Sequence, residues 1–208
     1  PIRLDREDIR RPFEVSSPCA ATYEEEGTRL TAGLVAERSA PYGYYNRGLT
    51  LEEGRGTRWP HLAFKVDSRY LEHTVTRDQV VEDRHFHKVR DLIDETLAER
   101  VPERLLEAAE RSAAEVAEPK DATRHDDICR LVTCYLQRYG EPRSDWEEVP
   151  LIPTARRGAV SLEACREAAD ENRLIVVDRD VDVGHVDTDY VIGVSLGDAG
   201  GMDDLLGH

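Results

Sequence analysis

The chain has 208 residues, of which 39% are hydrophobic and 34% are charged, a balance typical of a globular protein rather than a disordered one. No apolar run approaches the roughly 20 residues that a membrane span requires, so we expect no membrane partner. The formal net charge of -15 argues against nucleic acid as a partner, because an acidic surface repels phosphate backbones.

Residues 1–85 are predicted to form the larger, sheet-containing domain of an α/β protein. The stretch up to Gly27 shows no clear period and is expected to be partly irregular. Short apolar runs bounded by glycine and proline predict strands of one sheet, at residues 30–36, 49–52 and 62–66. Pro41 and Gly43 lie between the first two runs and indicate turns.

Residues 86–120 are predicted to be helical, since apolar residues recur every three or four positions from Val81 onward. A proline does not fit the interior of an undisturbed helix. Pro102 therefore predicts that one helix ends near Arg100 and that the next begins with Pro102 in its first turn. Pro119 is expected to close this second helix.

Residues 121–208 are predicted to form a small α/β domain with a loose tail after Gly197. Its expected elements are a helix at 125–138, a strand at 149–154, a helix at 161–169 and strands at 174–177 and 190–196. The whole chain is thus expected to hold a sheet-and-helix domain, a helical segment and a small α/β unit.

The cysteines indicate no disulfide framework. Cys19, Cys129, Cys134 and Cys165 form neither a CxxC pair nor a regular ladder, so we expect buried, reduced thiols. The first ten residues lack the apolar stretch of a secretory signal, which predicts a cytoplasmic location.

The most informative segment is an extended run that is expected to lead into the long helix. It contains Val66-Asp67-Ser68 and, eight positions further on, Thr76-Arg77-Asp78. The segment resembles part of the heat-shock protein 90 chaperones of the GHKL ATPase superfamily, in which a Val-Asp-Ser strand leads to a Ser-Arg-Glu helix start. Upstream, Ala40-Pro41-Tyr42 is similar to a loop of that family, and the run at 174–177 is similar to a later strand.

The resemblance covers roughly residues 30–180 and implies the middle segment of such a chaperone, with a ribosomal-protein-S5-domain-2-like fold. It implies that Arg77 is both the catalytic and the ATP-contacting residue. The guanidinium would reach the γ-phosphate of ATP held by the N-terminal domain of the same protein, where a planar, always-charged group stabilises the charge on the phosphoryl oxygens. On local sequence alone, Thr76 and Gln79 instead form a capping box, and Arg77 is simply the first residue of a helix.

ATP and Mg are implied to bind to that N-terminal domain, which we expect to lie outside this chain because no Asp-x-Gly-x-Gly turn is present. The chain alone is therefore expected neither to bind ATP tightly nor to hydrolyse it. Client proteins are implied as partners, and the intact parent is implied to be a homodimer.

Two alternatives remain open. One is a non-catalytic protein-interaction module of the same fold. The other is the transducer domain of a related GHKL ATPase that acts on DNA. Such transducers use a lysine to sense phosphate, so the acidity of the chain and the Arg77 context disfavour this second alternative.

Possible metal ligands are weak candidates, and no metal site is predicted. Asp178, Asp180 and Asp182 alternate as calcium ligands do, and Asp189 falls at the twelfth position. However, Gly184 comes one place late and the last ligand is not glutamate, so a solvated strand end or turn is expected. His85 and His87 would lie on different sides of a helix, which predicts surface histidines.

An aromatic cluster is the remaining candidate. Tyr42, Tyr44, Tyr45 and Trp59 lie around glycine- and proline-rich turns. Partly exposed aromatic side chains there would suit contact with a partner protein, such as a client. The alternative is that they pad the edge of the sheet.

Overall fold

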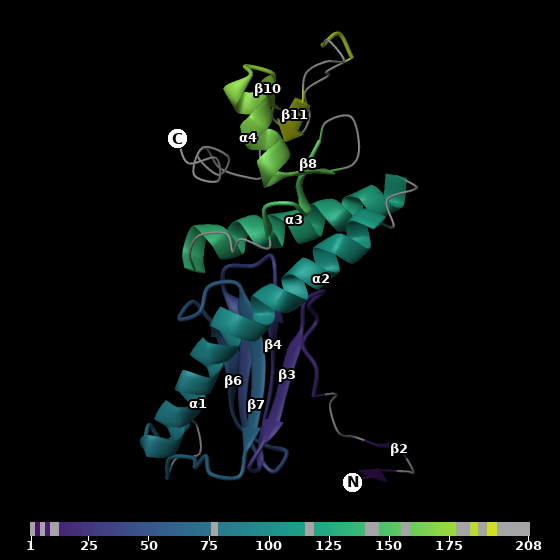
Figure 1. Cartoon of the computed structure of the whole chain (residues 1–208). Helices are drawn as coiled ribbons and strands as arrows, with labels where there is room; N and C mark the ends of the chain where they lie inside the picture. Colours follow the sequence, from purple (N-terminus) through teal and green to yellow (C-terminus); the bar gives the residue numbers. More distant parts are fainter. Residues whose placement is uncertain are drawn as a thin grey trace. The chain divides into compact units, whose positions relative to one another are not determined.

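The computed structural model describes residues 3–4, 7–8, 13–75, 79–114, 119–139, 146–154, 159–177, 184–186 and 191–194. The protein has a mixed α/β structure, and its chain divides into two compact units, Pro1–Pro102 and Glu103–His208 (Figure 1). None of the helices within the described residues is long and apolar enough to cross a membrane.

The first unit is built on a five-stranded mixed sheet. Its elements are β1 (Arg3–Leu4), β2 (Glu7–Asp8), β3 (Ala21–Glu25), β4 (Thr28–Leu34), β5 (Ala40–Asn46), β6 (Leu49–Gly56), β7 (Leu62–Ser68) and α1 (Arg84–Glu95). The strand order is β3-β4-β7-β5-β6, and β1 pairs only with β2. All neighbours in the large sheet are antiparallel except β5 and β7, because β7 returns to lie between β4 and β5.

The three predicted strands are confirmed as β4, β6 and β7, but the five-stranded sheet contains two further strands, β3 and β5. β3 lies in the stretch expected to be partly irregular, where its acidic residues occupy an edge strand. β5 contains Pro41 and Gly43, which were predicted to mark turns. Pro41 is paired only with Arg55 of β6, and pairing with β7 begins one residue later, so no bond to β7 is lost at the proline.

Both faces of the sheet are covered. On one face, α1 packs through Phe86, Val89 and Ile93, which are buried against the strands. On the other, the chain from residue 13 to 20 lies along β4, where the hydroxyl of Ser17 donates to the carbonyl of Leu34 at 2.7 Å. The last five residues of β4, from Leu30 to Leu34, are accordingly all buried.

The helical stretch after residue 83 is continuous in backbone. α1 passes into a π-helical turn, η1 (Thr96–Arg100), and then into α2 (Val101–Ala114). Pro102 lies in the first turn of α2, as predicted, and it provides no N–H for an α-helical bond. A wider, π-helical turn such as η1 can accommodate a residue that does not fit the α-helical hydrogen-bond pattern. The predicted break is therefore a change of helix type.

The second unit contains α3 (Pro119–Tyr139), β8 (Pro150–Pro153), β9 (Ala159–Ser161), α4 (Leu162–Asp170), β10 (Leu174–Val177) and β11 (Val191–Val194). The predicted helices and strands of this part are confirmed, with β9 in addition. β8 pairs with β9 antiparallel, and β10 pairs with β11 parallel. Pro119 begins α3 rather than closing α2, which suits a residue that lacks an N–H.

None of the four cysteines, all of which the structure describes, forms a disulfide, as expected, and all but Cys134 are buried. Burial raises the pKa of the Cys165 thiol to about 11, and it also raises the pKa of Cys129, so both remain protonated at neutral pH. The core around them includes Trp146, which is 1% exposed and lies 5.7 Å from the Tyr135 ring.

Candidate functional site

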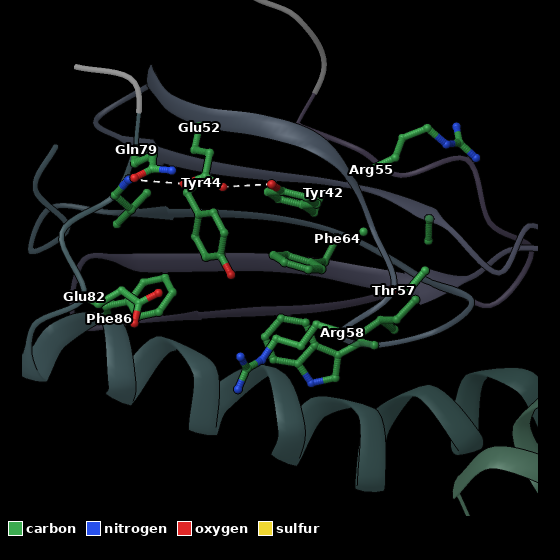
Figure 2. A pocket seen from close by; sticks show the side chains of 15 residues that line it. Tyr42, Tyr44, Glu52, Arg55, Thr57, Arg58, Phe64, Gln79, Glu82 and Phe86 are labelled. Carbon is green, nitrogen blue, oxygen red and sulfur yellow. Dashed lines mark hydrogen bonds between the residues drawn. The ribbon is translucent and has the colours of Figure 1, made fainter. Parts of the chain in front are cut away.

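A pocket of about 460 Å³ lies in the first unit, between the sheet and the start of α1 (Figure 2). Its residues come from β5, β6 and β7, from the turn between β6 and β7, and from the segment that precedes α1. This volume falls within the range of small-molecule and side-chain binding pockets, which are commonly apolar with a few placed polar groups.

Five aromatic rings form one connected surface of the pocket, which we call the aromatic wall: Phe86, Tyr44, Tyr42, Phe64 and Trp59. Phe86 lies 5.5 Å from Tyr44 between ring centroids, Tyr44 lies 5.5 Å from Phe64, and Phe64 lies 5.4 Å from Trp59. Tyr42 lies 5.9 Å from both Tyr44 and Phe64. These spacings are those of favourable edge-to-face and offset contacts, so the wall is held in place by its own packing.

The strand period decides which tyrosines belong to the wall. Side chains alternate across a strand, so Tyr42 and Tyr44 share the face toward α1. Tyr45 lies on the opposite face, with its ring 5.9 Å from Phe13. A Cβ at Gly43 would lie 2.6 Å from the Tyr45 hydroxyl, so the glycine is needed for the Tyr45 ring to lie flat over its own strand.

One end of the pocket is acidic. Glu52 accepts hydrogen bonds from the Tyr42 hydroxyl at 2.8 Å and from the backbone N–H of Val80 at 3.2 Å (Figure 2). The hydrogen bond to Glu52 raises the pKa of Tyr42 above its ordinary value. Glu82 lines the same end and is exposed. Glu52 therefore joins the edge strand β6 both to its neighbour β5 and to the segment that precedes α1.

Tyr44 has the most unusual environment in the pocket. Its side chain is 5% exposed, and Figure 2 shows its hydroxyl pointing away from the sheet into the space in front of α1. Burial raises the pKa of Tyr44, the carboxylates of Glu52 and Glu82 raise it further, and the guanidinium of Arg90 acts in the opposite direction. The hydroxyl thus remains protonated and is available as a donor within the pocket.

The other end of the pocket is basic. The guanidinium of Arg58 lies over the Trp59 ring, 5.0 Å from its centroid. The indole N–H of Trp59 donates to Asp94 of α1 at 2.5 Å, which fixes the ring between sheet and helix. Arg55 extends away from the rings in Figure 2 and donates to the carbonyl of Ser39 at 2.9 Å. Only Arg58 therefore brings its charge to the wall from this end.

Arg77, the predicted catalytic and ATP-contacting residue, lies outside the described residues, as do Thr76 and Asp78. The chain on either side is described. The N–H of Thr74 donates to the carbonyl of Gln79 at 2.9 Å, and His73 forms an antiparallel bridge with Val80.

The predicted helix start at this position is wrong. Gln79 and Val80 belong to the bridge with His73 and are not helical. The helix begins seven residues after Arg77, with Asp83 as N-cap accepting from the N–H groups of His85 and Phe86 at 2.8 and 2.9 Å. Gln79 is thus not the third residue of a helix, and the first turn of α1 is capped by Asp83.

The remaining candidates gain no role in the site. The aspartates Asp178, Asp180, Asp182 and Asp189 lie outside the described residues. His85 is stacked on Tyr70, with ring centroids 5.3 Å apart, and His87 is exposed. Within the described part of the chain, no group of three or more histidine, cysteine, aspartate or glutamate side chains is placed to hold a metal ion.

Of the aromatic cluster identified in the sequence, Tyr42, Tyr44 and Trp59 line the pocket and Tyr45 does not. Sequence reasoning missed the charged partners Glu52, Glu82 and Arg58, and it missed the rings of Phe64 and Phe86. Phe64 and Phe86 read as ordinary core positions. Nothing in the local sequence shows that β7 and α1 meet at the tyrosines.

The sequence matches no protein-family model, and no curated protein is significantly similar to it.

Proposed function

We propose that this chain is the middle segment of an ATP-dependent molecular chaperone of the heat-shock protein 90 family. Its part in protein folding is to supply Arg77 to ATP in the N-terminal domain and to present a surface to client proteins. Support comes from the order of motif and structure: Val66-Asp67-Ser68 forms the end of β7, and Thr76-Arg77-Asp78 begins eight positions after Ser68. The mixed sheet with a helix on one face suits the ribosomal-protein-S5-domain-2-like fold of this proposal.

The observation that carries the proposal is the anchoring of the chain on both sides of Arg77. Thr74 and Gln79 are joined by a backbone hydrogen bond, Val81 donates to the carbonyl of Glu72 at 2.8 Å, and Val80 is held by Glu52. A side chain that stabilises a transferring phosphoryl group must be mounted on rigid backbone, because an error of about 1 Å costs much of its effect. The described residues on both sides of Arg77 are held in place by these bonds.

In this proposal ATP and Mg bind to the N-terminal domain of the parent protein, which acts in the cytoplasm as a homodimer. Closure of that domain onto this segment brings Arg77 to the γ-phosphate, and the motion acts on a bound client. The chain alone then neither binds ATP tightly nor hydrolyses it.

The second candidate is a protein-interaction module that has no ATPase partner. The aromatic wall favours it, since an accessible pocket lined by aromatic rings and a few charges suits the binding of another polypeptide. This candidate needs no role for Arg77, so the two are separated by the function of that residue.

The test is the ATPase rate of the full-length parent with Arg77→Ala and Arg77→Lys, with ATP affinity measured by calorimetry. We expect both variants to lose about 10³-fold in kcat at unchanged ATP affinity, because a lysine does not reproduce the planar fork of arginine. Arg84→Ala, an exposed arginine in the first turn of α1, is the matched control and should leave the rate unchanged. Equal rates for wild type and Arg77→Ala would reject the proposal and leave the interaction module.

A further inference from the structure

We propose that the pocket binds a basic side chain of a partner polypeptide, a lysine or arginine whose aliphatic stem lies on the aromatic wall and whose charged head lies between Glu52 and Glu82. The inference names a partner chemistry for the client surface and rests on the proposed function for its biological setting. Its physical basis is independent of ATP.

The Tyr44 hydroxyl offers a polar contact inside the pocket. Tyr44 is 5% exposed, and Figure 2 shows its hydroxyl pointing into the pocket. A ligand polar group placed against this hydroxyl would gain a hydrogen bond in a mostly buried setting. The hydroxyl also accepts hydrogen bonds through its lone pairs, as an ammonium or guanidinium donor requires.

The charges near the Tyr44 hydroxyl also favour a cation. The fields of Glu52 and Glu82 both reach the Tyr44 hydroxyl, and among the charges that act there only Arg90 is positive. Two carboxylates against one guanidinium leave the acidic end of the pocket favourable to a cation. Glu82 is exposed at this end and lines the pocket.

The rings of the aromatic wall also suit contact with a cation. Arginine guanidinium groups lie over Phe13, Trp59, Tyr70 and Tyr23 in this structure. At the basic end of the wall, Arg58 thus already covers Trp59. Within the described residues no cation covers the Tyr44 or Phe86 ring, although both lie beside the acidic end. A partner's basic side chain would add the same cation-to-ring contact there, with its stem on the apolar ring surface.

The edge position of β6 favours a polypeptide over a free small cation. β6, which contributes Glu52 to the pocket, is an edge strand, and its outer edge is unpaired among the described residues. An extended segment of another chain can hydrogen-bond to such an edge and place alternate side chains toward the pocket. The net charge of -15 also attracts basic polypeptides over a long range.

The test uses the 208-residue chain without nucleotide and a fluorescently labelled ten-residue peptide in which lysine alternates with apolar residues. Binding is followed by fluorescence anisotropy. Two matched peptides replace lysine by glutamate or by norleucine, which keeps the stem and removes the charge. We expect the lysine peptide to bind and the other two to bind at least about tenfold more weakly.

Variants of the chain locate the site. Glu82→Gln should weaken binding of the lysine peptide about tenfold because it removes a negative charge. Tyr44→Phe should weaken it severalfold because it removes one hydroxyl, and both changes keep the shape of the side chain. Glu53→Gln is the matched control, since Glu53 is the neighbour of Glu52 on β6 but bonds to Tyr45 on the opposite face. Far-ultraviolet circular dichroism confirms that each variant is folded.

Absence of binding by the lysine peptide, or equal binding by the norleucine peptide, would overturn the inference. So would an unchanged affinity in Glu82→Gln. If acetyl-lysine amide bound as tightly as the peptide, the site would be one for a small cation, and the polypeptide partner would be rejected. Because the assay contains no ATP, these outcomes leave the ATPase test of Arg77 unaffected, and the converse also holds.

Discussion

The carboxylate of Glu52 accepts a hydrogen bond from the backbone N–H of Val80 at 3.2 Å, and this contact fastens the chain after residue 78 to the edge strand β6. The same carboxylate accepts from the Tyr42 hydroxyl. One side chain therefore couples the pocket to the segment that carries Arg77.

Glu52→Gln should loosen this segment. Glutamine retains the shape and can donate to the Tyr42 hydroxyl, but its oxygen is neutral, so the hydrogen bond from the Val80 N–H loses its charge assistance, at a cost of about 1 to 1.5 kcal/mol. We expect hydrogen exchange at the Val80 amide to accelerate roughly tenfold, measured by nuclear magnetic resonance. Glu53→Gln should leave that amide unchanged, and an unaltered exchange rate in Glu52→Gln would show that the bond does not hold the segment.

Asp83→Ala should destabilise the first unit by about 1 kcal/mol in urea unfolding, because the first turn of α1 loses its N-cap. Asp91→Ala, an exposed aspartate in the same helix, is the control and should cost nothing. Hydrogen bonds from the backbone N–H groups of Phe86 and His85 hold the pKa of Asp83 below its ordinary value.

The contribution of the Asp83 cap to the stability of the first unit is therefore fully present above the unfolded-state pKa of about 3.9. It is lost as the pH falls through the lower folded-state pKa. Wild type should lose more stability than Asp83→Ala between pH 5 and pH 2.5. Equal losses would mean that the cap does not depend on the charge.

The second unit should weaken on mild acidification through His125. This residue is 1% exposed, and its Nδ1 lies 2.6 Å from the Ser112 hydroxyl. Burial lowers the pKa of His125, although the Asp126 carboxylate and a backbone contact at Pro150 act to raise it. The neutral ring is thus favoured in the folded state.

Because the folded-state pKa is depressed, stability is complete above the unfolded value of about 6.5 and falls as the pH drops below it, by up to about 1.4 kcal/mol per pH unit. We expect the urea midpoint to decrease between pH 7.5 and pH 5.5. In His125→Gln, which cannot titrate, the midpoint should be nearly constant over this range. A wild-type midpoint that does not change would refute the prediction.

Part of the fold could be predicted because a buried face imposes its period on the sequence. β4 and β7 each contain a short apolar stretch, and α4 follows its N-cap Ser161 with apolar residues at helical spacing. β5 escaped prediction because Pro41 and Gly43 are common in turns. In this sheet the proline precedes the doubly paired part of the strand, and the glycine makes room for Tyr45.

The sequence by itself determined that the protein combines a sheet and helices, that its surface is strongly acidic and that tyrosines gather near Pro41. These properties depend on composition and on local period, which need no knowledge of distant partners. Only the tertiary structure decided that Glu52, Tyr44 and Phe86 form one pocket. Their meeting depends on the pairing register of β5 with β6 and on the packing of α1 across them, and both are set by contacts between residues far apart in the chain.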